Sequence, residues 1–581
     1  MKTRLILLIS LMLAGFLSAA PVELVDEKPV KTGSRPGVGV EVDFGGVSFG
    51  NLQVTLPEGT RAKLKVHFGE ASKNGRIDRK PPGTVRYAVA EVDVEGGKPV
   101  VIAPPADARN TKQPAAVLTP GEWGVVLPFR WVEIEGWPAG ADTASIVRRS
   151  AYLKGWDDDA AAFSSSNEVL DRIWELCRYS IKATTFAGVY VDGDRERIPY
   201  EADAYLNQLS HYATDPDLQM ARDTYDRLME QPTWPSEWGP HMVFMAHADW
   251  MHSGKTDWLA PRFDALRGKL LLERAGSDGL IRSDAKQRSW NDIVDWPDGE
   301  RDGYVRTEIN TVVNAFHLAA LRQMARMAVA LGRDKEAEEF GGRYEKTLAV
   351  FHERLYMKDK GCFRDGVGTD HAAQHASLFP LAFGLVPAGE EARVAEWVAS
   401  RGMRCSVYAA QYLMEGLFMF GQDEAAMDLI LADGDRSWRH MLESGTTITW
   451  EAWDQKYKPN QDWNHAWGAA PANLLPRFVL GAEPIEPGWK LVRIRPCLSG
   501  LEEASGKMPT PAGPLMVHWV NRNGFGLKIE LPEGVSARVE VPASGPGAKV
   551  LVDDQPVEAK WQDGRMVLTE TLSGKRKIVV R

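Results

Sequence analysis

Apolar and polar residues alternate in short runs over the first part of the chain, from about residue 21 to residue 155. The runs LQVTL, AKLKVHF and YAVAEVDV place apolar residues two positions apart, and glycine, proline, asparagine and aspartate separate the runs. An alternation of period two predicts strands with one buried face, and closely spaced turn residues predict many short strands in succession. The pattern therefore predicts an N-terminal β-sandwich domain over residues 21–155.

From about residue 167 to residue 480 the period of the pattern changes to that of helices, within a central domain placed at residues 156–482. In VVNAFHLAALRQMARMAVALG the apolar residues recur every three or four positions and form one stripe, made of Val313, Phe316, Ala320, Met324, Met327 and Leu331. Such stripes need partner helices to bury them. The clearest predicted helices span residues 167–188, 201–214, 239–254, 306–332, 335–355, 389–401, 405–420 and 464–480. About a dozen helices with connections of uneven length favour a double ring of six helix pairs, an (α/α)6 barrel, over an up-down bundle.

Residues 151–166, AYLKGWDDDAAAFSSS, join these two parts of the chain. The stretch is typical of a linker, and its serine cluster is suited to cap the helix that follows. We therefore place a domain boundary near residue 155.

After Pro484 the chain returns to alternating runs, among them LVRIRPCL, PLMVHWV, FGLKIELP and SARVEVP. Glycine and proline turns separate them, as in an antiparallel β-domain. A small C-terminal β-domain is expected over residues 483–581. The predicted fold class is thus a multidomain chain with a central all-α barrel between two β-domains.

The formal charge of the chain is −10. Nucleic-acid binding is not expected, because phosphates require clustered lysine and arginine. The twenty tryptophans and fourteen tyrosines are many for 581 residues. Flat aromatic faces suit sugar rings, although packing in the core accounts for most such residues.

The first twenty residues, MKTRLILLISLMLAGFLSAA, combine a basic start, an apolar run of about a dozen residues and small residues at the end. This is the pattern of a secretory signal peptide, so we expect an exported protein, periplasmic or secreted. The apolar run is short for a membrane span and no lipidation cysteine follows it, so the mature chain is not expected to insert stably in a membrane. The four cysteines show no metal-site spacing and are expected mostly as buried free thiols.

One stretch of the helical region, YVDGDRERIPYEADAY at residues 190–205, is crowded with carboxylates and flanked by apolar residues. It lies between two predicted helices, so we expect it in a loop at the rim of the barrel. The acidic residues are Asp192, Asp194, Glu196, Glu201 and Asp203.

Three interpretations of this loop remain open. A calcium site is the weakest, because Arg197 stands where such a loop needs glycine and Arg195 repels a cation. A buried ion network is the second, with both arginines neutralising neighbouring carboxylates. A catalytic site is the third, because an active site also holds one carboxyl protonated beside ionised neighbours.

Hydrolysis of a glycosidic bond needs a second carboxyl group opposite the first. The best candidate is Glu451 in GTTITWEAWDQKYKPNQDWNHAWG, where it lies between Trp450 and Trp453. Asn464 and His465 follow in the same stretch. A lone glutamate between tryptophans also fits an accidental position at the rim, but the Asn-His pair thirteen residues on and the many aromatic residues of the chain favour a functional site.

These two stretches resemble the motifs of glycoside hydrolase family 78, the α-L-rhamnosidases, which read D-C-P-x-R-E-R-L-G-W-T-G-D and T-T-x-W-E-x-W followed by N-H. The R-E-R of the first motif falls on Arg195, Glu196 and Arg197, and its last aspartate falls on Asp203. The second motif falls on residues 446–453. HFGEASKNGRIDR, LPFRWVEIEGW and LGAEPIEPGWKLVRIRP extend the resemblance over essentially the whole mature chain.

The resemblance implies an (α/α)6 barrel and inverting hydrolysis of terminal α-L-rhamnosides, with no cofactor and no metal. Glu196 would be the general acid and Glu451 the general base that activates water. Asp203 and His465 would hold the sugar hydroxyls. Two aromatic side chains would form walls of the sugar site, Tyr200 and Trp453.

The chain departs from the first motif at several positions. Val191 replaces its opening aspartate, so Asp192 or Asp194 is expected to take over a contact to a sugar hydroxyl. Glu201 replaces threonine and adds an acid that can compete with Glu196 as proton donor. The preferred sugar can therefore differ from that of typical family members.

Further candidates for saccharide contacts lie in the other rim loops, namely Trp238, Asp295 and Trp296. Two other classes of protein also fit the pattern. A polysaccharide lyase can use the same barrel but needs a tyrosine or histidine base and no carboxylate pair. A non-catalytic carbohydrate-binding protein would keep the tryptophans and lose the acids, whereas both motif glutamates are present here.

Overall fold

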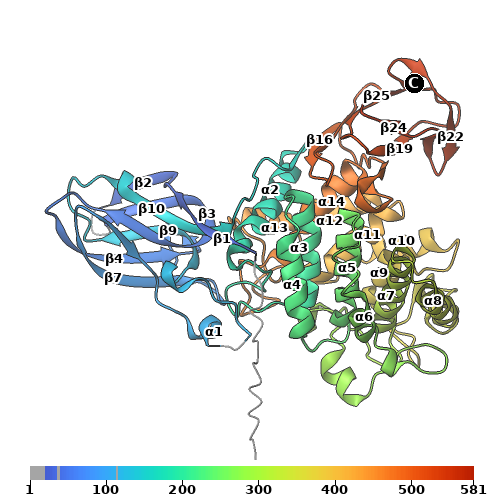
Figure 1. Cartoon of the computed structure of the whole chain (residues 1–581), viewed down its shortest axis with the longest axis horizontal. Helices are drawn as coiled ribbons and strands as arrows, with labels where there is room; N and C mark the ends of the chain where they lie inside the picture. Colours follow the sequence, from blue (N-terminus) through green and yellow to red (C-terminus); the bar gives the residue numbers. More distant parts are fainter. Residues whose placement is uncertain (1–19, 36–38, 113–114) are drawn as a thin grey trace, which may run out of the picture.

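The computed structural model describes residues 20–35, 39–112 and 115–581. A blue sheet domain lies at one end of the molecule, helices fill the centre, and orange to red strands form the rest (Figure 1). The predicted signal peptide falls almost entirely on residues 1–19, outside the described residues. Among the helices described, none combines the length and the apolar character needed to cross a bilayer.

The N-terminal domain is built on an eight-stranded antiparallel sheet in the order β1-β10-β3-β9-β4-β7, with β2 and β8 also paired to β3. Strand β3 can serve these neighbours because it is long and its register with β9 shifts between Asp43 and Ser48. The strands are β1 (Val22–Glu27), β2 (Lys31–Arg35), β3 (Gly39–Thr55), β4 (Arg61–Gly69), β7 (Tyr87–Glu95), β8 (Pro99–Ile102), β9 (Leu127–Glu135) and β10 (Ile146–Leu153).

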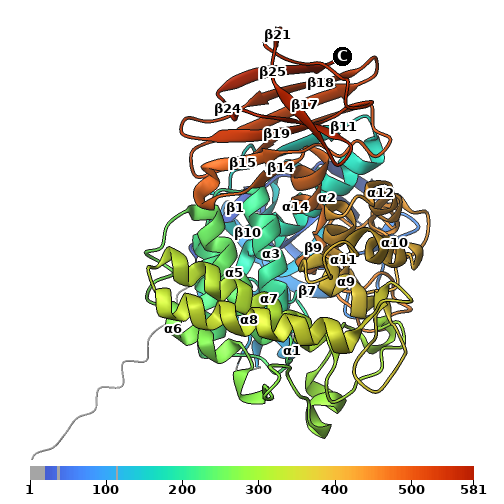
Figure 2. The same ribbon diagram turned by 90° about the vertical axis from the view of Figure 1, so that its right-hand side faces the viewer.

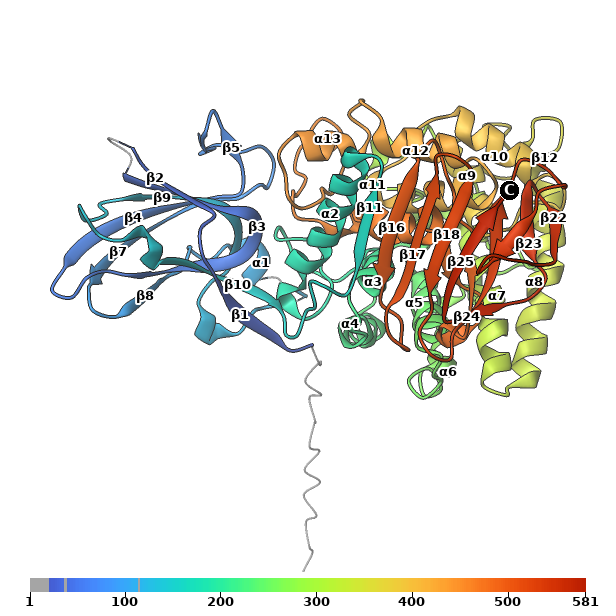
Figure 3. The same ribbon diagram turned by 90° about the horizontal axis from the view of Figure 1, so that it is seen from above.

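Two short elements lie between the strands of this sheet in sequence, the hairpin β5 (Ser72–Lys73) and β6 (Arg76–Ile77) and the single-turn helix α1 (Ala108–Thr111). Figure 3 shows the sheet standing beside the helical part, with α1 near the junction. The loop between β4 and β7 and the short helix α1 contact the helical domain, where they support the candidate site.

Six helices of the central domain contact one another in a closed sequence, α3 with α5, then α7, α9, α11, α14 and back to α3. They are α3 (Glu201–Thr214), α5 (Trp238–Ser253), α7 (Thr311–Ala330), α9 (Gln374–Ala382), α11 (Val407–Met419) and α14 (Pro471–Leu474). The remaining helices are α2 (Glu168–Ala183), α4 (Gln219–Glu230), α6 (Phe263–Leu266), α8 (Asp334–Leu355), α10 (Glu391–Ser400), α12 (Asp423–Leu431) and α13 (Trp438–Glu443).

Burial distinguishes the two sets of helices. Twelve of the sixteen residues of α5 are buried, whereas α8 buries four of its twenty-two. A helix that is apolar on all sides belongs in the interior, and one with a single stripe covers a surface. Helices such as α5 therefore form the inner wall, and helices such as α8 the outer one.

The predicted apolar stripe of α7 is confirmed from Val313 through Phe316, Ala320 and Met324 to Met327, which are fully buried, and its last member, Leu331, is the half-buried C-cap. Residues 306–310 precede the helix as a loop, because the side chain of Asn310 caps it by accepting from the Val313 N–H. The prediction of one helix over residues 464–480 is wrong. The segment holds a 3₁₀ turn (Ala466–Gly468), the short α14 and a wider turn (Leu475–Val479), since Pro471 and Pro476 lack the N–H groups that a continuous helix needs.

The C-terminal domain consists of two sheets, one ordered β11-β16-β17-β18-β25-β20-β21 and one ordered β14-β15-β19-β23-β22, with β24 also paired to β19. Figure 2 shows these sheets stacked over one end of the helices. The strands are β14 (Ala482–Pro484), β15 (Leu491–Ile494), β16 (Glu503–Met508), β17 (Leu515–Asn521), β18 (Phe525–Glu530), β19 (Ser536–Pro542), β20 (Val550–Val552), β21 (Gln555–Pro556), β22 (Ala559–Gln562), β23 (Arg565–Leu568), β24 (Leu572–Ser573) and β25 (Lys575–Val580).

The edge strand β11 (Ala162–Ser165) comes from the stretch interpreted as a linker. It alternates between exposed and less exposed positions, which suits an edge, and it pairs antiparallel with β16. The cap of the next helix is Asn167, whose side chain accepts from the N–H groups of Val169 and Leu170. The prediction that the serine cluster caps this helix is therefore wrong. All four cysteines are buried and free, as predicted.

Candidate active site

Two loops meet at the N-terminal end of α3. One holds the acidic segment between α2 and α3, and the other runs from α13 to the 3₁₀ turn that begins at Ala466. The N–H of Asp194 donates to Asn464 Oδ1 at 2.7 Å, and the N–H of Arg195 donates to Asp462 Oδ2 at 3.3 Å. Gly193 has φ of 106°, and a Cβ there would lie 3.0 Å from side-chain oxygens of Asp462 and Asn464. Glycine lets the two loops approach this closely.

Arg195 lies between the two glutamates that the sequence singles out. Its Nη1 and Nη2 bond the carboxylate oxygens of Glu451 at 2.9 and 3.1 Å. Its Nε lies 3.5 Å from Glu196 Oε1. One guanidinium therefore brings together residues 196 and 451 from distant parts of the chain.

Glu451 is surrounded by donors. Lys458 Nζ lies 3.1 Å from Oε1, and the N–H of Asp462 donates to Oε2 at 3.2 Å. Burial acts to raise the pKa of Glu451, but Arg195, His465 and Lys458 outweigh it and hold the pKa below the usual value. The carboxylate is thus kept ionised, as a general base must be.

Glu196 is the more open member of the pair, with a side chain 32% exposed against 3% for Glu451. The hydroxyl of Tyr200 donates to Glu196 Oε2 at 3.1 Å. Buried Asp192 lies alongside, where it accepts from the Ile198 N–H at 2.9 Å. Burial and the charge of Glu196 raise the pKa of Asp192 well above its usual range, because neighbouring carboxylates resist ionising together.

Asp203 and His465 form a buried pair, in which His465 Nε2 and Asp203 Oδ1 are 2.7 Å apart. The other ring nitrogen of His465, Nδ1, is buried and has no hydrogen-bond partner among the described residues. An unpaired ring nitrogen next to the glutamates is available to a ligand hydroxyl.

Two predicted substrate contacts, Asp194 and Arg197, lie instead in a buried ion network. Arg197 bonds Asp194 Oδ1 from Nε and Nη2 at 2.9 and 2.6 Å, and Arg86 of the N-terminal domain binds the other oxygen. Arg197 also lies over the ring of Phe186, with its Cζ 5.0 Å from the ring centroid. This geometry matches the ion-network interpretation for these two residues.

Three further candidates are enclosed in the packing. The ring of Trp453 is fully buried against Trp438, and its Nε1 donates to the Cys405 carbonyl at 2.8 Å. Asp295 is fully buried and bonds His375 Nε2 at 2.7 Å. Glu201 accepts from the N–H of Thr233 at 2.9 Å, and burial raises its pKa. Their predicted roles at the sugar have no support in these contacts.

Three aromatic candidates remain beside the glutamates. Tyr200 and Trp238 pack edge to face with centroids 5.5 Å apart, and Trp238 Nε1 is buried without a described partner. Half-buried Trp296 has the ammonium of Lys458 5.9 Å from its ring centroid. Because Lys458 also bonds Glu451, Trp296 belongs to the same site.

The N-terminal domain contributes residues that the sequence did not reveal. Thr84 Oγ1 donates to an oxygen of Asp462 and to the Gln461 carbonyl, the latter at 3.0 Å. Glu70 Oε1 accepts from Asn464 Nδ2 at 2.8 Å. These contacts join positions nearly 400 residues apart, so no local pattern could have indicated them. Arg195 was visible in the motif, but its position between the glutamates was not.

Glu451, Asp462 and His465 each offer a ligand atom, and the three atoms lie within 4.8 Å of one another. Arg195 and Lys458 already bond both oxygens of Glu451. The negative charge of this cluster is therefore balanced by side chains, and it is arranged as an ion-pair site.

The protein-family and structure comparisons agree with this geometry. Residues 158–479 match the model of the bacterial alpha-L-rhamnosidase 6 hairpin glycosidase domain, and residues 481–554 match the bacterial alpha-L-rhamnosidase C-terminal domain. The first match covers more than half of the chain, and the chain therefore belongs to this family of six-hairpin glycosidases. The resemblance to glycoside hydrolase family 78 is confirmed.

Individual relatives are distant. An alpha-L-rhamnosidase of Alteromonas sp. (strain LOR) is 23% identical over 478 residues, which are 75% of this chain and 50% of that protein. One from Streptomyces avermitilis is 22% identical over 457 residues, 72% of this chain and 42% of that protein. The chain spans about half the length of these curated relatives.

Solved structures show the same fold. The alpha-L-rhamnosidase from Dictyoglumus thermophilum superposes with a TM-score of 0.80 at 17% identity, covering 97% of this chain and 64% of that one. The Streptomyces avermitilis alpha-L-rhamnosidase complexed with L-rhamnose superposes with a TM-score of 0.78 at 19% identity, covering 97% and 54%.

Proposed function

We propose that the chain is an exported glycoside hydrolase with an (α/α)6-barrel catalytic domain, which releases terminal α-L-rhamnosyl residues with inversion at the anomeric carbon. The observation that carries the proposal is the bridge from Arg195 to both Glu196 and Glu451. Family membership, the names of the relatives and the closed contact sequence of the inner helices support it.

In this mechanism Glu196 is the general acid. Its side chain is the more accessible member of the pair, so a leaving-group oxygen can reach it, and the Tyr200 hydroxyl fixes its orientation. Glu201 is a poorer donor, because Thr233 binds its carboxyl group within the packing. Buried Asp192 lies beside Glu196, and two carboxyl groups this close resist ionising together, as in other acid/base sites.

Glu451 is the general base. Arg195 and Lys458 keep it ionised until it removes a proton from the attacking water. An inverting enzyme needs its carboxyl groups roughly 6.5–9.5 Å apart so that water fits between sugar and base, whereas a retaining pair is about 5 Å apart. The guanidinium that separates Glu196 from Glu451 supports the wider spacing.

Sugar hydroxyls are assigned to the buried pair of Asp203 and His465, whose free ring nitrogen lies at the site. Tyr200, Trp238 and Trp296 supply the aromatic walls. The histidine–aspartate pair and the three aromatic side chains bind the sugar ring and its hydroxyls. Glu196 and Glu451 catalyse cleavage of the glycosidic bond.

The direct test is hydrolysis of an aryl α-L-rhamnoside followed by NMR of the first sugar formed. Inversion predicts that β-L-rhamnose appears before mutarotation. Initial formation of the α-anomer would contradict the inverting mechanism, and products that absorb as unsaturated sugars would indicate a lyase. Aryl glycosides of other sugars serve as substrate controls.

A further inference from the structure

A cavity of about 820 Å³ lies at the end of the helical domain away from the two glutamates. Its wall includes Tyr212 from the C-terminal end of α3 and Met251 from the C-terminal end of α5. The N-terminal ends of the same helices carry Glu201 and Trp238 at the candidate active site. None of the site residues predicted from sequence lines this cavity, so it is a separate feature of the molecule.

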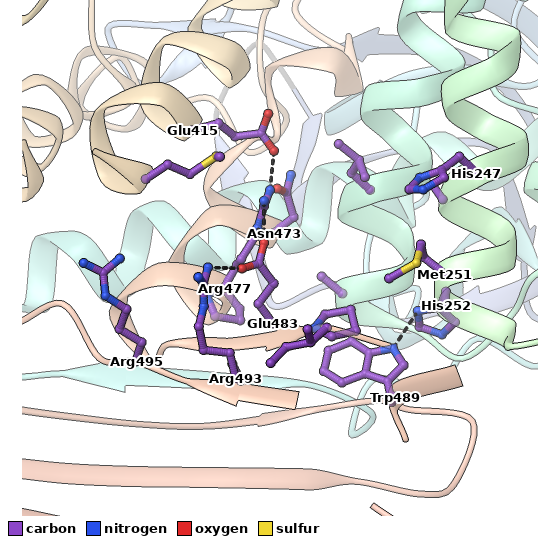
Figure 4. A pocket seen from close by; sticks show the side chains of 18 of the residues that line it. His247, Met251, His252, Glu415, Asn473, Arg477, Glu483, Trp489, Arg493 and Arg495 are labelled. Atoms are coloured by element: carbon purple, nitrogen blue, oxygen red, sulfur yellow. Dashed lines mark hydrogen bonds and ion pairs between the residues drawn. The ribbon is translucent and has the colours of Figure 1, made fainter. Parts of the chain in front are cut away.

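The opposite wall comes from the C-terminal domain. Figure 4 shows Arg493 and Trp489 from this domain below His252 and Met251 of α5. The exposed side chains of Arg326 and Gln562 stand at the mouth, one from each domain. The cavity is therefore open to solvent along the junction of the two domains.

The lining carries an excess of positive charge. Seven arginines face four carboxylates, which leaves a formal charge of +3. Part of this set is paired, since Arg477 bonds Glu415 and Glu483, and Arg493 bonds Glu483 along one wall (Figure 4). Burial lowers the pKa of the two lining histidines to about 3 and about 4, so they add no charge at neutral pH.

Three of the lining arginines have no carboxylate within ion-pair distance among the described residues. Arg322 donates to the Phe383 carbonyl at 2.5 Å, and Arg565 donates to the Pro496 carbonyl at 2.8 Å. Arg326 donates to the sulfur of Met251 at 3.7 Å. A guanidinium at the wall of a cavity that has no carboxylate partner favours an anion from solution.

Two buried polar atoms of the lining also lack partners among the described residues, His247 Nε2 and Gln323 Oε1. Unsatisfied buried polar atoms are costly, so such atoms normally bond water or a ligand. Both belong to the inner helices, α5 and α7, and His247 lies on the helical side of the cavity in Figure 4.

Aromatic side chains complete the lining, among them Tyr205, Phe244, Phe383 and Trp489. Flat apolar faces beside arginine and amide groups suit a ring that carries both hydroxyl and acidic groups. The volume is within the roughly 300–1,000 Å³ of small-ligand sites. We propose that this cavity is a second saccharide site, which binds an anionic sugar, carboxylated or sulfated, through the arginines that have no carboxylate partner.

The proposal is tested by calorimetric titration of the full chain with a hexuronate trisaccharide and with its methyl-esterified, neutral counterpart. We expect binding of the acidic probe that weakens with salt, and at least tenfold weaker binding of the ester, because the ester removes the charge that arginine recognises. Inorganic sulfate is the third probe and distinguishes a sugar site from a site for small anions.

Arg326→Gln and Arg565→Gln are the test variants, and Arg61→Gln on the far sheet is the matched control for net charge, since Arg61 is exposed and pairs only with Glu95. Each test variant is expected to weaken binding of the acidic probe about tenfold while leaving hydrolysis of aryl α-L-rhamnoside unchanged. Arg326 is exposed and makes no carboxylate pair, so its variant is expected to fold normally.

Equal binding of the acid and its ester, binding of sulfate as tight as that of the trisaccharide, or unchanged binding by both variants would overturn the proposal. Absence of binding at millimolar concentration would do the same. Because the readout is binding, a failure here leaves the proposed hydrolysis intact, and an inactive chain that still binds the acidic trisaccharide would refute only the hydrolysis.

Discussion

Arg195 bonds both carboxylate oxygens of Glu451 with the two ends of its guanidinium, at 2.9 and 3.1 Å. A bidentate pair of this kind fixes the orientation of the carboxylate as well as its charge. Arg195 immediately precedes Glu196 in the same loop, so one backbone segment positions Glu196 and controls the ionisation of Glu451.

Replacement of either glutamate tests the acid and base roles. Glu196→Gln and Glu451→Gln are each expected to lower kcat on aryl α-L-rhamnoside by at least about a hundredfold, because a general acid or base contributes about that much. Glu443→Gln, at an exposed position on α13, is the matched control and should retain full rate. Full activity of either test variant would reassign its role.

Removal of Arg195 should change the pH profile. The arginine lowers the pKa of Glu451, and the base acts only when ionised, so Arg195→Met should raise that pKa and move the acid limb of kcat/KM to higher pH. A neighbouring opposite charge shifts a carboxyl pKa by about 1–3 units, which sets the expected displacement. Arg195→Lys keeps the charge and should shift the limb less. An unmoved acid limb in the methionine variant would show that another group limits the rate at low pH.

Asp203→Asn should act mainly on substrate binding. The change weakens the bond that orients His465 and leaves Glu196 and Glu451 in place. We expect KM to rise about tenfold or more, the effect of losing a charge-assisted hydrogen bond, with a smaller change in kcat. Steady-state kinetics on the aryl glycoside provide the measurement, and an unchanged KM would argue against contact of this pair with sugar hydroxyls.

Thr84 tests the support that the N-terminal domain gives to the base. Its hydroxyl holds Asp462, whose N–H in turn holds Glu451. Thr84→Val leaves a buried acceptor unpaired, which should cost about 1–3 kcal/mol of stability and also lower kcat in the folded enzyme. Thr84→Ser restores the hydroxyl and should restore the rate. A variant that melts earlier but keeps its kcat would limit Thr84 to a structural role.

Glu70 should make stability depend on pH. Burial raises its pKa to about 8, whereas the same group in the unfolded chain ionises near 4.5. The folded protein therefore holds a proton that the unfolded chain releases. This stabilisation is complete below about pH 4.5, declines as pH rises and is lost above about pH 8, on the order of a few kcal/mol in total.

Urea unfolding at pH 5 and pH 8 measures this dependence. Glu70→Gln keeps the shape of the side chain and removes the titration, so its free energy of unfolding should fall less between the two pH values than that of the original protein. Equal pH dependence in both proteins would place the titration in other groups, such as Glu237 or Asp462, whose pKa values are also raised.

The helical and strand patterns were readable from sequence because each depends on neighbours along the chain. The buried stripe of α7 and the capping role of polar residues before helices follow local rules. The prediction of one helix over residues 464–480 is wrong because it rests on the apolar periodicity and gives no weight to the two prolines of the segment. Strand β11 was missed because four residues carry too little pattern to distinguish an edge strand from a linker.

The sequence predicts which residues form the site where those residues are close to one another along the chain. The motif placed Glu196 next to Arg195 and Asp192, and it placed Glu451 near His465. Burial of Trp453 and Asp295 depends on helices elsewhere in the chain, and the contacts of Glu70 and Thr84 depend on how two domains meet. Such relations between distant segments are set by tertiary packing, which composition and periodicity do not encode.

Because β11 pairs with β16, the C-terminal domain depends for one of its edge strands on the segment that joins the N-terminal domain to the helical domain. Strand β11 precedes all the helices of the central domain, and it completes a sheet whose other strands follow them all. Deletion of the last hundred residues would expose an unpaired strand at the start of the helical region, and a transplanted C-terminal domain would lack its own edge. A chimera that exchanges the C-terminal domain between relatives must therefore also exchange residues 162–165, although some 340 positions of sequence separate them from their partner strand.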